Sequence, residues 1–155
     1  FYDYSLVDPD NRRPVDFERR IGGLAEGADW PDLSVQWPDG RIKFALTRRL
    51  LEIRNNYADL FRDGRYDPVP VDGEDAEHVV AFTRSLGKRR VLVAAGRRFA
   101  ARTAGGHQWP AGWRGAIATP FPSARDLIGD RSINNGMELG QLFDVLPVAV
   151  VATEE

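Results

Sequence analysis

The chain has 155 residues, of which 43% are hydrophobic, and its 21 basic and 23 acidic residues leave a formal net charge of −2. This length predicts one domain, or one domain with an appendage, and the scattered basic residues predict no nucleic-acid partner. The absence of cysteine excludes disulfides and thiolate chemistry and favours a reducing cytoplasm. Two histidines are too few for a histidine-built metal site, and no apolar run is long enough to span a membrane, so we expect no metal, no cofactor and no membrane partner.

The chain opens with a polar segment that Pro9 and Pro14 stiffen. Carboxylates, amides and guanidinium groups bind sugar hydroxyls with defined geometry. The segment is therefore a candidate carbohydrate-binding loop with five polar residues, Asp8, Asp10, Asn11, Arg12 and Arg13. The alternative is a solvated connector in which the carboxylates pair with the arginines and only brace the loop.

A short helix is predicted next, capped by Asp16 and carrying Phe17, Ile21 and Leu24 on one face. Residues 28–40 contain prolines and glycines that interrupt any period, so they predict a structured loop with two tryptophans, Trp30 and Trp37. These tryptophans can anchor the loop by packing or can carry sugar rings, and packing is the commoner case.

The longest periodic segment predicts a helix that begins at Asp39 as cap and ends at Gly64. Its apolar stripe should lie against a sheet or a barrel, against the β domain, or against another copy, and consists of Ile42, Leu46, Leu50, Ile53, Tyr57 and Leu60. Lys43 lies in the first turns, either near a substrate or as an ordinary solvated lysine.

After Gly64 the pattern becomes extended. The β-branched runs 79–85 and 91–95 predict a hairpin with a turn around Gly87. Further strands are predicted around 66–71, 115–119, 124–128, 137–142 and 148–153. Short strands at this spacing, with no helix between them, are typical of an antiparallel sandwich.

His107, Trp109 and Trp113 gather in a glycine-rich segment. As a surface loop they would offer a stacking platform for starch-like chains; the alternative is a hydrophobic plug beneath a loop, because aromatic side chains are more often buried than displayed.

Residues 4–16, with the run Ser5-Leu6-Val7-Asp8-Pro9-Asp10-Asn11-Arg12-Arg13-Pro14, resemble the loop after the last barrel strand of the maltooligosyltrehalose synthase family, in the alpha-amylase superfamily. Residues 37–44 and 50–54 resemble the final barrel helix of that family. Three later segments resemble its C-terminal β domain, namely 60–66, 81–84 and 146–150.

The resemblance implies an α+β fold in which residues 1–64 are the last loop and helix of a (β/α)8 barrel and residues 65–155 are a C-terminal antiparallel β-sandwich. It also implies that the six residues Asp8, Asp10, Asn11, Arg12, Arg13 and Lys43 border a sugar-binding cleft at the C-terminal face of the barrel. The family's catalytic carboxylates would precede Phe1, so we expect a piece of a longer polypeptide and no catalytic residue within this chain.

The activity implied is an intramolecular transglucosylation in the cytoplasm, which converts the reducing-end maltose unit of a maltooligosaccharide into a trehalose unit. The partners implied are the oligosaccharide and an upstream catalytic barrel. The alternative is a non-catalytic β-sandwich module that binds α-glucans or braces a neighbouring domain.

Overall fold

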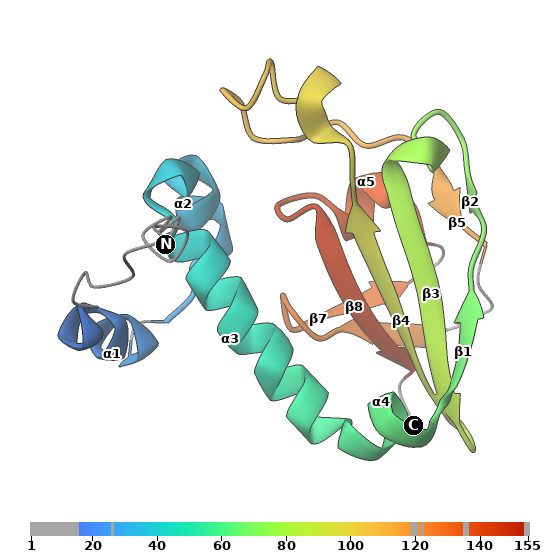
Figure 1. Cartoon of the computed structure of the whole chain (residues 1–155). Coiled ribbons are helices and arrows are strands. Elements are labelled where there is room, and N and C mark those ends of the chain that lie inside the picture. Colours follow the sequence, from blue (N-terminus) through green and yellow to red (C-terminus); the bar gives the residue numbers. More distant parts are fainter. Residues whose placement is uncertain (1–15, 26, 119–120, 122, 135–136, 154–155) are drawn as a thin grey trace, which may run out of the picture.

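The computed structural model describes residues 16–25, 27–118, 121, 123–134 and 137–153, and the N-terminal third of these is helical (Figure 1). The helices there are α1 (Phe17–Ala25), α2 (Trp30–Val35), the 3-10 turn η2 (Trp37–Asp39), α3 (Arg41–Asn56) and α4 (Ala58–Asp63).

An antiparallel six-stranded sheet follows, with the strand order β1-β3-β4-β8-β6-β7. Its strands are β1 (Arg65–Pro68), β3 (Val79–Leu86), β4 (Arg89–Gly96), β6 (Ser123–Asp126), β7 (Arg131–Asn134) and β8 (Val148–Thr153). A second sheet has two strands, β2 (Val71–Asp72) and β5 (Ala116–Ile117). Three short helical elements connect strands: η3 (Ala76–His78), η4 (Phe99–Ala101) and α5 (Leu139–Leu142).

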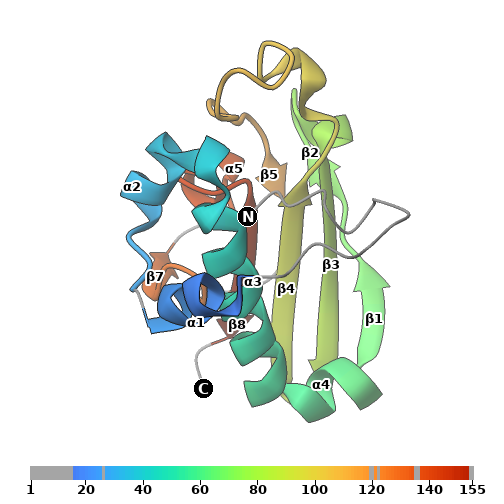
Figure 2. The same cartoon turned by 60° about the vertical axis from the view of Figure 1, so that its left-hand side comes forward.

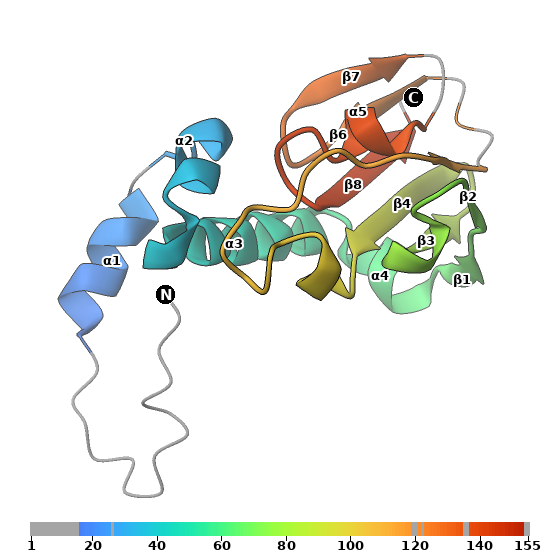
Figure 3. The same cartoon turned by 90° about the horizontal axis from the view of Figure 1, so that it is seen from above.

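The six-stranded sheet is covered on both faces. Successive residues of β4 and β8 enter two different cores, because side chains alternate across a strand. Val91 and Val150 face the core made with the helices, whereas Leu92 and Val151 face the core made with Trp113, Ile117 and α5. In Figures 2 and 3 α3 crosses the face of the sheet that carries Val91 and Val150, so helix and sheet form adjacent layers. Central strands covered on both sides explain the continuous apolar runs in β4 and β8.

The predicted stripe of the long helix is confirmed. Ile42, Ile53 and Leu60 are buried in the core that α3 and α4 share with the sheet, and Leu46, Leu50 and Tyr57 pack against it. The helix breaks at Tyr57, and its N-cap position is Gly40. Asp39, the predicted cap, accepts a hydrogen bond from the Arg41 amide at 2.8 Å.

The predicted short helix and hairpin are also confirmed. In α1 the Asp16 carboxylate accepts a hydrogen bond from the Arg19 amide at 2.9 Å. The two hairpin strands pair from Val79–Gly96 to Leu86–Arg89, and Gly87 in the turn between them has a φ of 61°. A type of turn with positive φ favours glycine, which is the signal that the sequence carried.

Two predicted elements were wrong, and one strand was missed. Residues 28–40, predicted as a loop, contain α2, which Asp29 caps by accepting from the Asp32 amide at 3.1 Å. Residues 137–142, predicted as a strand, pair with β5 only through an isolated bridge at Glu138 and then turn into α5. Strand β7 was not predicted.

The α+β class and the antiparallel sheet are confirmed, whereas the finer expectation of a barrel end followed by a sandwich stays a prediction. Within the part of the chain that the structure describes, no helix is both long and apolar enough to cross a membrane.

Candidate functional site

Of the six predicted site residues, Asp8, Asp10, Asn11, Arg12 and Arg13 lie outside the described residues. Lys43 is described: it is exposed in the first turn of α3 and lines a pocket.

This pocket, which we call the tryptophan pocket, lies between the start of α3, the loop after η4 and the turn before β8. Its volume is about 350 Å³, and its lining is mostly apolar. Trp37 and Trp109 contribute their indoles, with ring centroids 6.1 Å apart and planes inclined by 43°. The other lining residues are Ile42, Lys43, Leu46, Phe99, Thr103, Gly106, Gln108, Pro110, Leu146 and Pro147.

Thr103 fixes the shape of the loop that forms one wall of the pocket. Its hydroxyl donates to the Phe99 carbonyl at 2.9 Å, and its own carbonyl accepts from the amides of Gly106, His107 and Gln108 at 2.8–3.0 Å. Further along, the Trp109 indole nitrogen donates to the Val145 carbonyl at 2.7 Å. The loop is therefore held by its own backbone hydrogen bonds and by the bond from Trp109 to the turn before β8.

A buried ion pair holds Arg102 at one end of this loop. Asp75 pairs with Arg102, accepts from the Arg114 amide at 2.6 Å, and is 3% exposed. The Arg102 guanidinium also lies 4.5 Å from the centre of the Trp113 ring, a cation–π distance. Burial raises the pKa of Asp75, but the hydrogen bonds from Arg114 and Arg102 outweigh it and hold that pKa below its ordinary value.

The aromatic cluster that the sequence suggested is divided by the structure. Trp113 is 5% exposed and packs edge-to-face against Phe143, which is the plug alternative. His107 is exposed and is not among the residues that line the pocket. Trp109 is half-buried at the pocket, where its partner is Trp37. Trp37 was predicted to pack, but its place at a pocket was missed because no local pattern links it to Trp109.

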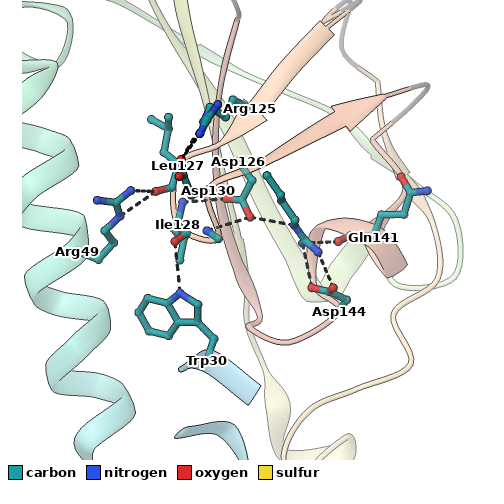
Figure 4. A network of polar contacts seen from close by, with 11 residues as sticks. Trp30, Arg49, Arg125, Asp126, Leu127, Ile128, Asp130, Gln141 and Asp144 are labelled. Carbon is teal, nitrogen blue, oxygen red and sulfur yellow. Dashed lines mark hydrogen bonds and ion pairs between the residues drawn. The ribbon is translucent and has the colours of Figure 1, made fainter. Parts of the chain in front are cut away.

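A second network ties the helices to the turn between β6 and β7 (Figure 4). Arg49 of α3 donates twice to the Leu127 carbonyl, at 2.9 and 2.6 Å, and the Trp30 indole donates to the Ile128 carbonyl at 3.3 Å. Trp30 and Arg49 also line a cavity of about 380 Å³ between α1, α3 and this turn. These contacts fix α3, and with it Lys43, relative to the sheet.

Asp126 holds the inner side of the same turn (Figure 4). Its carboxylate accepts from the Ile128 amide at 3.0 Å and from the Gly129 amide at 3.3 Å, and Arg131 lies 3.3 Å away. Burial raises the pKa of Asp126 above its ordinary value, although these three partners act in the opposite direction. Arg131 is held in turn by Asp144, at 2.5 and 2.9 Å.

Both networks brace turns of the fold. The carboxylates of Asp75 and Asp126 are engaged by amides and guanidinium groups that brace turns, not by a nucleophile. Among the described residues no group of three or more histidine and acidic side chains is placed to hold a metal ion. The tryptophan pocket, by contrast, is lined mostly by apolar side chains.

Comparisons with known proteins give a consistent likeness. No protein-family model matches the chain. It is 41% identical over 83 residues to a protein of two Mycobacterium tuberculosis strains that is assigned as a maltooligosyl trehalose synthase, a match that covers 54% of this chain and 9% of that protein. The solved structure of maltooligosyltrehalose synthase from Arthrobacter ramosus matches 99% of this chain with a TM-score of 0.69 and 29% identity. A mutant of that enzyme gives a TM-score of 0.67 and 27% identity.

The α+β fold and these likenesses relate the chain to enzymes of carbohydrate metabolism. More particularly, the chain is similar to part of the maltooligosyltrehalose synthases, which confirms the resemblance seen in its sequence segments. It spans 9% of the length of the curated relatives and 19% of the matched structures.

Proposed function

We propose that the chain is the C-terminal part of a cytoplasmic enzyme that converts the reducing-end maltose unit of a maltooligosaccharide into a trehalose unit. In this reaction a carboxylate of an upstream barrel forms a glucosyl-enzyme and releases the terminal glucose. The anomeric hydroxyl of that glucose then attacks the intermediate, so the glycosidic bond is remade without net hydrolysis. The supporting observation is the structural likeness to maltooligosyltrehalose synthase along 99% of the chain.

In this proposal the chain braces the barrel and shapes the rim of its cleft. Residues 1–64 would be the last loop and helix of the barrel, and residues 65–155 would be the C-terminal β-sandwich domain. The polar residues 8–13 together with Lys43 would contact sugar hydroxyls, and an ordered rim would keep water from the glucosyl-enzyme.

The exposed apolar face of α1 supports the proposal that another part of the enzyme packs against it. Phe17, Ile21 and Leu24 share one side of this helix and are 66%, 65% and 46% exposed. Apolar residues gathered on an exposed face mark an interaction surface. In this proposal the partner is the upstream barrel, for which the matched structures leave room because they are about five times longer than this chain.

The test compares this chain with the longer polypeptide that carries it, using maltopentaose and a reducing-end assay. We expect the longer polypeptide to remove reducing ends and form a non-reducing product without releasing glucose stoichiometrically, and the 155-residue chain to do neither. Loss of reducing ends with the short chain alone, or none with the longer polypeptide, contradicts the proposal.

A pair of variants tests the α1 face separately. Ile21→Glu should reduce the yield or activity of the longer polypeptide but leave the melting temperature of the short chain almost unchanged, because Ile21 is 65% exposed there. Glu18→Gln, in the first turn of the same helix, is the control and should change neither. Equal effects of the two variants would show that the apolar face has no partner.

A further inference from the structure

We propose that the tryptophan pocket is a binding site for a short α-1,4-linked glucan. The choice of ligand rests on the proposed function, whereas the site itself follows from the geometry of the described residues. The pocket brings together side chains from η2, from the start of α3, from η4 and the loop after it, and from the turn before β8.

The two indoles give the pocket its chemistry. The face of a glucose ring that carries C–H bonds is apolar and packs on an aromatic plane, while its hydroxyls point outward. Successive rings of an α-1,4-linked chain are inclined to each other. The planes of Trp37 and Trp109 are inclined by 43°, with centroids 6.1 Å apart, so the two indoles do not form the single flat platform that would suit a flat β-linked chain.

The size and charge of the pocket favour a neutral ligand. Its volume of about 350 Å³ is at the lower end of the range of about 300–1,000 Å³ that is usual for small-molecule sites. Among the described residues that line it, Lys43 alone carries a charge, which is poor provision for a phosphorylated or polyanionic ligand. Lys43 and Gln108, which are both exposed, supply polar groups among the lining residues, as a ligand with both apolar faces and hydroxyls requires.

The wall of the pocket is organised before a ligand arrives. Thr103 stabilises the loop through hydrogen bonds of 2.8–3.0 Å. The Trp109 indole is hydrogen-bonded to the Val145 carbonyl, and Arg102 at one end of the loop is paired with Asp75. A braced loop loses little conformational freedom on binding, so weak stacking contacts give measurable affinity.

The experiment is a calorimetric titration of the 155-residue chain with maltopentaose, and with cellopentaose as the β-linked comparison. We expect a dissociation constant of about 1 mM or tighter for maltopentaose and clearly weaker binding of cellopentaose. Trp37→Ala should weaken maltopentaose binding by about ten-fold, the loss of one stacking partner.

Trp30→Ala is the matched control, because Trp30 is also half-buried but lines other cavities of the molecule. It should leave the affinity within about two-fold, a change too small to reflect a lost contact. If Trp37→Ala does not fold, judged by circular dichroism, the double variant Lys43→Ala with Gln108→Ala decides the question. Both of its side chains are exposed, and their removal should weaken binding without unfolding the chain.

Absence of binding, equal affinity for the two pentasaccharides, or equal effects of Trp37→Ala and Trp30→Ala would overturn the inference. These outcomes are separate from those of the proposed function. A longer polypeptide that makes a non-reducing product while the pocket binds nothing would refute only the glucan site. Specific binding at the pocket with no product from the longer polypeptide would refute only the proposed activity.

Discussion

Replacing Asp75 by Asn tests whether the buried ion pair with Arg102 holds the loop that forms the pocket. The two side chains are 4% and 18% exposed. Removing one partner of a buried pair costs about 3–5 kcal/mol, because the other charge is left without compensation. The Arg114 amide donates to the Asp75 carboxylate at 2.6 Å, and the asparagine oxygen can still accept this bond. We therefore expect a loss at the low end of that range, about 3 kcal/mol in the free energy of unfolding.

The measurement is urea unfolding at pH 7, followed by tryptophan fluorescence. Glu74→Gln is the control. Glu74 also faces an arginine, Arg114 at 3.1 Å, but the two side chains are 68% and 75% exposed, and a pair screened by water contributes less than about 1 kcal/mol. A loss below about 1 kcal/mol for Asp75→Asn, or equal losses for both variants, would refute the assignment of the pair as a structural clasp.

The pH dependence gives an independent check. The pKa of Asp75 is lower in the folded chain than its ordinary value, so the ionised carboxylate favours folding. Its contribution is present above the ordinary aspartate pKa of about 3.9 and is lost as the pH falls through the folded value. The difference between wild type and Asp75→Asn should therefore be constant from pH 7 to about 5 and shrink below about 4. A difference that does not change with pH would show that the charge of Asp75 is not what stabilises the loop.

Two further substitutions test how the helical layer is joined to the sheet. A Cβ at Gly64 would lie 2.3 Å from a backbone oxygen of α4, so Gly64→Ala should lower the free energy of unfolding by about 3 kcal/mol. The control is Gly22→Ala in α1, which has open space around it and should cost nothing. Equal melting temperatures of the two variants would contradict the close approach at Gly64. Arg49→Met removes two hydrogen bonds to the Leu127 carbonyl and should lower the free energy of unfolding in urea by about 1–2 kcal/mol. The control, Arg54→Met at an exposed position, should lower it by less than about 0.5 kcal/mol. A smaller loss for Arg49→Met would mean that the turn between β6 and β7 is held without α3.

The sequence predicted those elements whose signals are local. The stripe of α3 and α4 repeats over several turns, and the hairpin of β3 and β4 combines β-branched strands with a glycine in the turn. The signals that were misread were short. Asp29 caps α2 and Pro31 lies at its start, but both prolines of the segment, Pro31 and Pro38, were interpreted as interruptions of a loop. Leu139 and Leu142 are spaced by three residues, as in a helix, and both are buried, but the segment is too short for its period to outweigh its apolar content.

The pocket was not predictable from local pattern, because its parts meet only through tertiary packing. Trp109 was grouped with His107 and Trp113 on the ground of sequence proximity, yet its aromatic partner in the pocket is Trp37, which precedes α3. The two indoles come together because α3 is fixed to the sheet by its apolar stripe and by Arg49. A pocket built from segments this far apart along the chain leaves no spacing to recognise, only a pair of tryptophans beside prolines and glycines.

The same packing couples the pocket to the stability of the whole unit. Trp37 and Lys43 come from residues 1–64, and Trp109 comes from residues 65–155, so the predicted division of the chain runs through the pocket. The core that joins these parts contains Ile53 from the helix and Val91 from the sheet. A ligand that needs both walls binds only while this core is intact, and it must therefore stabilise the packing of α3 on the sheet by RT ln(1 + [L]/Kd). Separation of the helices from the sheet would abolish the pocket, whereas the six-stranded pairing itself could persist.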